Sequence, residues 1–253
     1  MTDIKLAWRA WKTRFRDQVF ELRAIRHALR SGGVAIDVGA NKGSYLYSMA
    51  RWAGSSQVVA FEPQRTLAHY LTGACQRSGL TNVTVENLAL SHQVGELDLF
   101  VPGNSHSPGA SLEASIADKT DCHKETVSVT TLDLYAAEKK LNAPVRVIKI
   151  DVEGHELAVV QGALDLIRRD KPLLVIECEG RHMPAGKTVH EFIALVVSLG
   201  YTATLAMPGL GELPAAQFQD NIHQKQAGER FWDAKDYYNN FIFRPIVSTG
   251  AAP

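Results

Sequence analysis

Residues 35–43 read Ala-Ile-Asp-Val-Gly-Ala-Asn-Lys-Gly, an apolar strand that runs into a glycine turn. A second apolar stretch ends in Phe61-Glu62-Pro63, about twenty residues further on. The glycines at 39 and 43 let backbone approach a ligand closely, and an acid that ends the next strand can accept hydrogen bonds from both ribose hydroxyls. Together the two motifs predict an α/β protein with a nucleoside site.

The spacing of the glycines separates two kinds of nucleoside site. A dinucleotide site is typically written G-x-G-x-x-G, whereas three residues stand between Gly39 and Gly43 here. Asp37 would repel a pyrophosphate, but it could hold the ammonium group of an amino-acid moiety, directly or through water. These features favour S-adenosylmethionine (AdoMet), which has an amino-acid end, a sulfonium cation and no phosphate. The alternative is a tight strand-to-helix turn without a ligand.

Composition narrows the class of protein further. With 253 residues, of which 45% are hydrophobic, the chain can bury the core of one α/β domain. Lys plus Arg and Asp plus Glu number 27 each, so no overall field steers the molecule to nucleic acid. The three cysteines are widely separated and form no CxxC pair, which argues against a disulfide framework and a cysteine zinc site.

Hydropathy gives no reason to place the chain in a membrane. The sequence has no apolar run approaching about eighteen residues, and its N-terminus is charged where a signal peptide would be apolar. We therefore predict a cytoplasmic protein with no nucleic-acid partner and no stable membrane insertion.

A basic segment precedes the first strand. Apolar residues recur in it at helical spacing: Trp8, Trp11, Phe15, Val19, Leu22, Ile25 and Leu29. We predict one amphipathic helix over residues 1–32, followed by a domain over 33–245 and a disordered tail over 246–253. The helix could lie on an anionic membrane or pack its stripe on the domain or a second subunit. Packing is favoured because the helix runs directly into the first core strand, and a homodimer through the helix is one outcome.

Strands and helices alternate along the rest of the chain, which is typical of a parallel sheet. The expected strands are 34–38, 57–61, 83–87, 95–101, 127–132, 145–150, 172–178, 201–206 and 240–243. The expected helices between them include 66–78, 156–168 and 188–199. A loop rich in Gly, Ser, Pro and Asn is expected over 102–118.

Acidic residues follow the strands of this predicted sheet. They are Asp37, Glu62, Glu86, Asp151, Glu153, Glu177 and Glu179. The carboxyl ends of parallel strands meet at one sheet edge, which is where open α/β sheets bind ligands. Carboxylates crowded together resist simultaneous ionisation, and this suits a site that binds a cation, a metal or a proton.

Five sequence blocks carry a family resemblance. They are residues 36–44 (IDVGANKGS), 61–63 (FEP), 87–91 (NLALS), 131–133 (TLD) and 148–156 (IKIDVEGHE). In this order they resemble the FkbM family of AdoMet-dependent methyltransferases, over about residues 33–180. The resemblance implies a Rossmann-like class I methyltransferase fold, with a seven-stranded, mostly parallel sheet whose last strand is antiparallel. It also implies methyl transfer to a hydroxyl oxygen of a sugar, a glycan or a related small metabolite.

The resemblance also implies roles for individual residues. By position, Asp37, Gly39, Asn41 and Gly43 would surround the methionine part of AdoMet, Glu62 the ribose, Asn87 and Ala89 the adenine edge, and Asp151 the region near the sulfonium. Asn87 could equally be a turn residue that closes the third strand.

Methylation of an alcohol requires removal of its proton, so a base or a metal is expected beside the acceptor. His155 is one candidate, with Glu153 or Glu156 to raise its basicity, although it could equally cap the helix beginning at Gly154. Asp151 and Glu177 could instead share the proton or hold a divalent cation. Because the sequence has no compact ligand motif such as D-x-D, we predict no metal.

Two other functional classes remain open. A nucleotide-dependent oxidoreductase would need the missing G-x-G-x-x-G and a hydride-transfer site. A non-catalytic AdoMet-binding or interaction protein would keep Asp37 and Glu62 but tolerate loss of Asp151 and His155. Loop 102–126 and segment 207–238 are expected to form the acceptor pocket, and their polar and aromatic residues favour a polyol.

Overall fold

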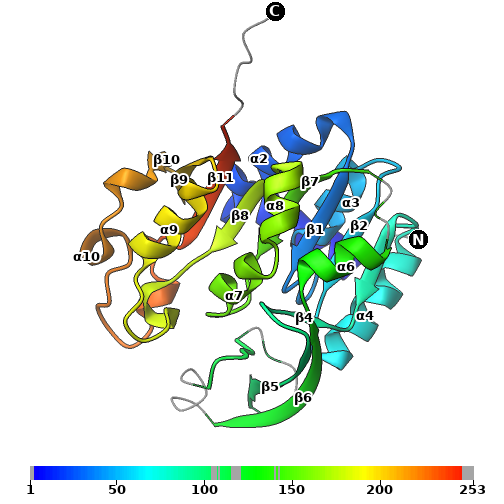
Figure 1. Ribbon diagram of the computed structural model, residues 1–253, viewed down its shortest axis with the longest axis horizontal. Helices are drawn as coiled ribbons and strands as arrows, with labels where there is room; N and C mark the ends of the chain where they lie inside the picture. The colour runs from blue at the N-terminus through cyan, green and yellow to red at the C-terminus, as the bar shows by residue number, and fades with distance from the viewer. Residues whose placement is uncertain are drawn as a thin grey trace, which may run out of the picture.

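The computed structural model describes residues 3–103, 107, 109–114, 121–139, 141 and 143–246. An eight-stranded sheet lies between two layers of helices, and a three-stranded sheet forms an arm beside it (Figure 1). The tail predicted over 246–253 falls outside the described residues, apart from Ile246.

The strand order of the large sheet is β10-β9-β11-β8-β7-β1-β2-β3, and that of the small sheet is β4-β6-β5. The large sheet consists of β1 (Val34–Val38), β2 (Val58–Phe61), β3 (Val83–Glu86), β7 (Val145–Ile150), β8 (Leu173–Glu177), β9 (Tyr201–Met207), β10 (Gly211–Pro214) and β11 (Asn240–Pro245). The small sheet consists of β4 (Ala89–Leu90), β5 (Gly95–Pro102) and β6 (Cys122–Thr130).

The predicted mostly parallel sheet is confirmed. Strands β3, β2, β1, β7 and β8 pair in parallel, whereas the last strand, β11, is antiparallel to both of its neighbours. The sheet has eight strands rather than seven because β10 pairs with the edge strand β9. Strand β10 has only four residues, none of them buried, so it lacks the apolar pattern by which the longer strands were predicted.

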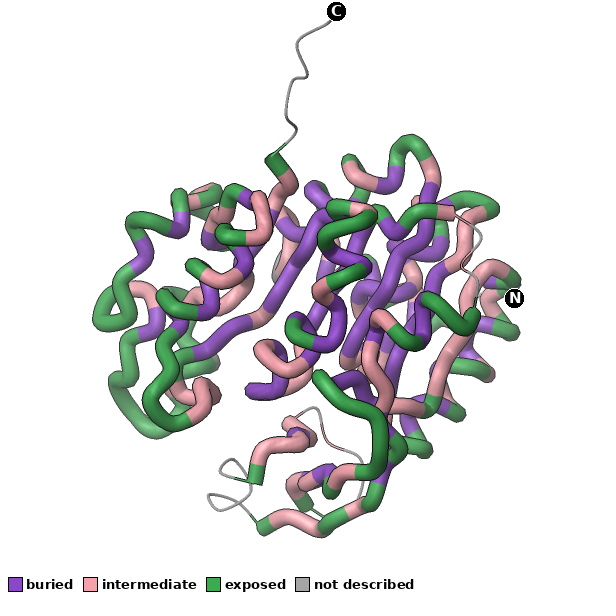
Figure 2. Tube along the Cα trace, viewed as in Figure 1, coloured by how far each residue is buried: buried purple, intermediate pink, exposed green. Residues whose placement is uncertain are grey.

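Alternating side chains of the strands enter two different cores. Val34, Ile36 and Val38 of β1 pack in one core with α6 (Leu132–Lys139), α7 (Glu156–Gln161), α8 (Leu164–Asp170) and α9 (Val189–Ser198). Ala35 faces the other, which is built with α2 (Val19–Ala28), α3 (Leu46–Trp52) and α4 (Arg65–Arg77). Because both faces are covered, the central strands β1 and β2 are buried throughout and are mostly apolar (Figure 2).

The basic N-terminal segment is not one helix, as predicted, but two. Helix α1 (Ile4–Lys12) passes through a π-helical stretch (Thr13–Asp17) and ends at Gln18, whose φ of −132° and ψ of 56° break the helix before α2. The predicted apolar stripe is therefore divided. Leu22, Ile25 and Leu29 are buried on the domain, whereas the first part of the stripe is exposed: Trp8 at 60%, Trp11 at 60% and Phe15 at 59%.

Two other boundaries differ from the prediction. The helix predicted over 156–168 is interrupted at Gly162 and Ala163, between α7 and α8. Gly162 lies so close to Ser91 that a Cβ there would be 2.0 Å from the Ser91 backbone oxygen. Strand β6 begins at Cys122 rather than at residue 127, and its residues 122–129 pair with β5. No helix within the described ranges is both long and apolar enough to cross a membrane.

Glu21 of α2 places an ionisable carboxyl group inside the core that this helix covers. Its side chain is buried and, within the described part of the chain, Oε2 has no hydrogen-bond partner. Burial raises the pKa of Glu21 to about 7, and the charge of Glu212 adds to this effect. The folded state therefore favours the protonated form of Glu21. The free energy of unfolding falls as pH rises from the pKa of Glu21 in the unfolded chain through about 7.

We expect Glu21→Gln to stabilise the protein progressively as pH rises, because the amide resembles the protonated acid and cannot ionise. Between about pH 5.5 and about pH 8.5 its advantage in free energy of unfolding should grow by roughly 2 kcal/mol. Urea denaturation at several pH values measures this difference. An advantage independent of pH would show that Glu21 does not titrate with folding.

Candidate functional site

A pocket of about 760 Å³, including the solvent at its mouth, opens where the parallel strands end. We call it the inner pocket. Phe61 and Glu62 line it from the end of β2, Leu88–Leu90 from the β3–β4 connection, and Leu99 and Leu112 from the arm. A volume of this size suits a small-molecule ligand, and its walls combine apolar side chains with a few carboxylates.

Glu62 is fixed in this pocket by backbone hydrogen bonds. Its side chain is buried, Oε2 accepts from the amide of Asn41 at 2.7 Å, and Oε1 accepts from the amide of Gln64 at 2.9 Å. Burial raises the pKa of Glu62 to about 7, although these two hydrogen bonds oppose the shift. Each carboxylate oxygen keeps further lone pairs, so the group can still accept hydrogen bonds from a diol.

The glycine turn is built around two close approaches. Gly39 has a φ of 75°, and a Cβ at this position would lie 1.8 Å from the backbone oxygen of Asp151. Asn41 also has a positive φ, 47°, which asparagine tolerates and which aims its amide at Glu62. At position 43 glycine allows close packing, because a Cβ there would lie 2.7 Å from Leu6 of α1. Gly39 and Asn41 line the inner pocket, whereas Gly43 lies under the N-terminal helix.

A second, adjoining pocket contains Asp37. We call it the helix pocket, because Trp8, Arg9 and Lys12 of α1 line it opposite the end of β1. Lys149 lies between two carboxylates there, with Nζ 3.0 Å from Asp151 and 3.7 Å from Asp37. Burial raises the pKa of Asp37, although the charge of Lys149 opposes this shift. For Lys149, burial alone would lower the pKa, but the charges of Asp151 and Asp37 outweigh burial and raise the pKa.

Lys149 belongs to the sequence block 148–156, but its part as the counter-ion of the strand-end acids was not predicted. Its position two residues before Asp151 places both side chains on one face of β7, and this is the signal that would have found it.

The two residues predicted at the adenine edge are separated by the structure. Ala89 lines the inner pocket. Asn87 instead donates from Nδ2 to the backbone oxygens of Glu62 and Pro63, at 3.0 and 2.7 Å, so its amide holds the turn after β2. The turn-residue reading of Asn87 therefore describes its contacts, and Asn87 acts on the pocket through the placement of Glu62.

His155 does not point into the site. The ring is buried, Nδ1 donates to Oε1 of Glu113 at 2.6 Å, and Nε2 lies 2.8 Å from Oγ of Ser91. Among the described residues that line the inner pocket and the helix pocket, His155 is absent. Its contacts tie the start of α7 to the small sheet and to the segment that contains Glu113.

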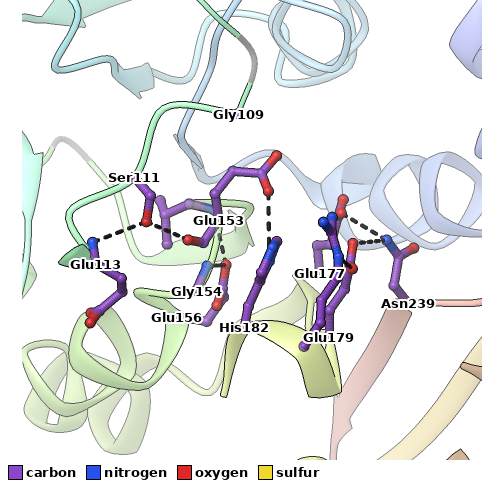
Figure 3. Close-up of polar contacts among 12 residues, drawn as sticks. Gly109, Ser111, Glu113, Glu153, Gly154, Glu156, Glu177, Glu179, His182 and Asn239 are labelled. Carbon is purple, nitrogen blue, oxygen red and sulfur yellow. Dashed lines mark hydrogen bonds and ion pairs between the residues drawn. The ribbon is translucent and has the colours of Figure 1, made fainter. Parts of the chain in front are cut away.

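Four carboxylates do converge, as predicted, around the ends of β7 and β8. Asp151, Glu153 and Glu177 line the inner pocket, and Asn239 donates to both Glu177 and Glu179 at 2.8 Å (Figure 3). Burial, with the charges of Asp151, Glu153 and Glu179, holds the pKa of Glu177 well above its usual range.

Glu179 is the member of this cluster whose negative charge is balanced by a cation, Arg181. Burial raises its pKa, but the hydrogen bond and charge of Arg181 outweigh burial and bring the pKa below its usual value. The hydroxyl of Tyr237 donates to the same carboxylate at 3.0 Å. The segment after β10 therefore supports Glu179 and Arg181 through Tyr237 and through Trp232, whose ring lies 4.7 Å from the Arg181 guanidinium. Among the described residues of the expected acceptor segment 207–238, none lines the inner pocket.

Glu153 is held in a strained conformation. Its φ of 51° is unusual for glutamate, and its neighbours fix it there: Ser111 donates to its backbone oxygen at 2.5 Å, and Glu156 accepts from the amides of Val152 and Gly154 (Figure 3). Strain of this kind persists where the surrounding structure over-determines it, and it clusters at functional sites.

The side chain of Glu153 faces His182, whose Nδ1 lies 3.7 Å from its carboxylate (Figure 3). Burial raises the pKa of Glu153 to about 8, and the charges of Asp151, Glu179 and Glu156 add to it. Only 8% of the His182 side chain is exposed. Within the described ranges, no three His, Cys, Asp or Glu side chains have the arrangement to hold a metal ion.

Comparison with known proteins gives a consistent result. The family model described as the methyltransferase FkbM domain matches residues 37–203. Among solved structures, the chain is similar to a methyltransferase FkbM from Methylobacillus flagellatus KT, with a TM-score of 0.52 and 17% identity, covering 84% of this chain and 43% of that one. The chain thus spans less than half the length of the Methylobacillus protein.

The fold is also similar to that of an O-methyltransferase from Bacillus cereus in complex with S-adenosylhomocysteine (SAH). The TM-score is 0.50 at 14% identity, and the match covers 96% of this chain and 90% of that one. No curated protein matches the sequence.

Proposed function

Because the chain belongs to the FkbM methyltransferase family, we propose that it transfers the methyl group of AdoMet to a hydroxyl oxygen of a sugar, a glycan or a related small metabolite. The observation that carries the proposal is the buried carboxylate of Glu62, which two backbone amides fix at the end of β2 and which lines the inner pocket. A carboxylate in this position matches a ribose diol and would repel a phosphate.

The residues of both pockets fit AdoMet. Glu62 would accept from the ribose hydroxyls, the apolar residues Phe61 and Leu88–Leu90 would surround the adenine, and Gly39 leaves room that a side chain would fill. Asp37, whose two carboxylate oxygens have no hydrogen-bond partner within the described part of the chain, would hold the ammonium group. Asp151 lines both pockets and would lie between the two ends of the cofactor, near the sulfonium.

When bound, AdoMet supplies an electrophilic methyl group on a sulfonium centre, open to in-line attack by an acceptor oxygen. The protein must align that oxygen and remove its proton. We assign the removal of this proton to Glu153, acting as the general base. Its raised pKa makes it a stronger base than an ordinary carboxylate, and Ser111 and Glu156 hold its backbone rigidly. Glu177 and His182 would complete the polar wall around the acceptor.

The number of hydrogen-bond acceptors that line the inner pocket supports a polyol as the methyl acceptor. Asp151, Glu153 and Glu177 could each accept from a hydroxyl, and Leu99 and Leu112 offer apolar surface for a ring face. Of the two segments expected to form the acceptor pocket, 102–126 contributes Ala110 and Leu112, and much of the rest of it lies outside the described residues.

Glu153→Gln is expected to lower kcat by roughly 100-fold or more, since the amide cannot accept a proton, while AdoMet affinity stays close to that of the wild type. In the wild type, kcat should fall as pH drops and Glu153 becomes protonated, with a midpoint no higher than about 8. Single-turnover kinetics across pH, with AdoMet binding measured by calorimetry, check both points.

His155→Gln is the comparison for this assignment. Because both ring nitrogens of His155 are already engaged with Ser91 and Glu113, we expect the variant to keep the wild-type pH profile, at reduced stability. If His155→Gln abolishes the pH dependence and Glu153→Gln does not, the base is the histidine and our assignment fails.

The proposed function as a whole is tested by calorimetry with AdoMet, SAH and NADH, followed by transfer of a labelled methyl group to a panel of nucleotide sugars and free glycosides. Binding of the adenosyl ligands and labelling of a sugar hydroxyl is the expected result. Binding of NADH alone would favour the oxidoreductase. Adenosyl binding without transfer to any hydroxyl would favour the non-catalytic AdoMet-binding or interaction protein.

Three further parts of the proposal concern the molecule as a whole: a catalytic domain over 33–245, a cytoplasmic location, and a homodimer through the N-terminal helix. The exposed face of α1, with Ile4, Trp8 and Trp11, supports the last. Sedimentation of the full chain as a monomer at micromolar concentration would rule the homodimer out.

A further inference from the structure

The helix pocket depends on residues outside the part of the chain that the family model matches. Its wall opposite the sheet comes from Trp8, Arg9 and Lys12 of α1, whereas the match begins at Asp37. Helix α1 therefore adds to the pocket residues that the family match does not cover.

The helix pocket and the inner pocket are continuous. Gly39, Asn41 and Asp151 line both of them, so the two hollows meet along the glycine turn and the end of β7. A ligand that places a ribose beside Glu62 in the inner pocket extends its other end across this turn into the helix pocket.

The helix pocket is electrically polarised. On the sheet side, the carboxylates of Asp37 and Asp151 outnumber the single ammonium of Lys149. Asp37 is 1% exposed, and neither of its carboxylate oxygens has a hydrogen-bond partner within the described residues. The wall formed by α1 carries two cations, Arg9 and Lys12, and Lys42 of the glycine turn is a third cation in the lining. A pocket with an anionic floor and a cationic wall complements a zwitterion.

Helix α1 is fixed over this pocket. Asp3 caps it, accepting from the Leu6 amide at 3.0 Å, and pairs with Arg77 of α4 at 2.9 Å. Leu6 is fully buried against Gly43 of the turn. The Arg9 guanidinium donates to the hydroxyl of Tyr70 on α4 at 2.8 Å, and Arg9 also lines the helix pocket.

We propose that α1 completes the cofactor site, with Arg9 and Lys12 binding the α-carboxylate of the amino-acid end of AdoMet or SAH, while Asp37 binds the α-ammonium. This inference rests on the proposed function, because it takes the adenosyl end to lie at Glu62. It gives the basic N-terminal segment a role in ligand binding. It also explains why that segment packs on the glycine turn rather than extending from the domain.

The test uses two probes that differ only at the amino-acid end. SAH carries the carboxylate and the ammonium, whereas 5′-methylthioadenosine keeps the adenosine and thioether and lacks both. Arg9→Gln, Lys12→Ala and the double variant are titrated with each probe by calorimetry, using the full chain. Lys5→Ala is the matched control, because it removes the same charge from the same helix at an exposed position that does not line the pocket.

We expect SAH to bind the double variant at least about 10-fold more weakly than the wild type, since hydrogen bonds to charged groups are lost, while affinity for 5′-methylthioadenosine is unchanged. Lys5→Ala should bind both probes as the wild type does. Thermal melting of each variant verifies that α1 is still folded.

Other outcomes would overturn the inference. Unchanged SAH affinity in the double variant, or an equal loss for both probes, shows that α1 does not read the amino-acid end, although the methyltransferase proposal stands. If neither probe binds the wild type, the proposed function itself fails. The two failures are thus distinguishable.

Discussion

Glu62→Ala is expected to weaken AdoMet and SAH binding by at least about 100-fold and to abolish detectable methyl transfer. Two hydrogen bonds from a ribose diol to a buried carboxylate account for a loss of this size. The alanine also leaves the amides of Asn41 and Gln64 without their acceptor, so part of the loss comes from the turn itself. Calorimetric titration measures the affinity.

Two further variants separate these contributions. Glu62→Gln keeps one oxygen acceptor and the shape of the side chain, so it should retain more of the fold's stability than Glu62→Ala. Glu86→Ala removes the carboxylate that ends the next strand, where Glu86 accepts from the Tyr135 hydroxyl, and it should leave SAH affinity unchanged. Equal losses at positions 62 and 86 would mean that the effect is general to the strand ends and that Glu62 is not the ribose acceptor.

The affinity of the wild type should depend on pH through the same group. Burial raises the pKa of Glu62 to about 7, and hydrogen-bond donors bind its ionised form better. Affinity is therefore expected to fall as pH drops below about 7, and Glu62→Gln should lose this dependence. Titrations in buffers of matched ionic strength provide the comparison.

The fold could be predicted largely from the sequence because its central strands are buried on both faces. Most residues of Val34–Val38 and Val145–Ile150 are apolar for that reason, and their order with the intervening helices is typical of a parallel sheet. The elements that were missed carry weak local signals. Strand β10 is short and unburied, and Gly162, where the helix is interrupted, packs closely against Ser91, which is distant in sequence.

The site was predictable where a residue's role follows from its place at a strand end. Glu62 and Asp151 are of this kind, and both line the inner pocket. Roles that depend on the direction of a side chain were not predictable. His155 lies only two residues after Glu153, yet the glutamate, which has a positive φ, lines the inner pocket, whereas the imidazole packs against Ser91 and Glu113. No local pattern encodes that choice.

Gly39→Ala is expected to be the most destabilising single substitution in the glycine turn. The new Cβ would lie 1.8 Å from the backbone oxygen of Asp151, and that oxygen cannot move away cheaply because the Asp151 amide donates to the backbone of Val38 at 3.1 Å. The φ of 75° adds the strain of a left-handed alanine. We expect a loss of roughly 3 to 5 kcal/mol in the free energy of unfolding, and a fall in Tm of roughly 10 °C.

Gly54→Ala separates the clash from the backbone strain. Gly54 has a similar φ of 63°, but a Cβ there would meet no described atom within 4 Å, so only the conformational cost of roughly 1 kcal/mol applies. The difference between the two variants in urea denaturation therefore measures how tightly the end of β1 approaches the end of β7. Equal losses would contradict this close approach. A much larger loss at Gly39 would establish that position 39 must be glycine for the fold, before any ligand binds.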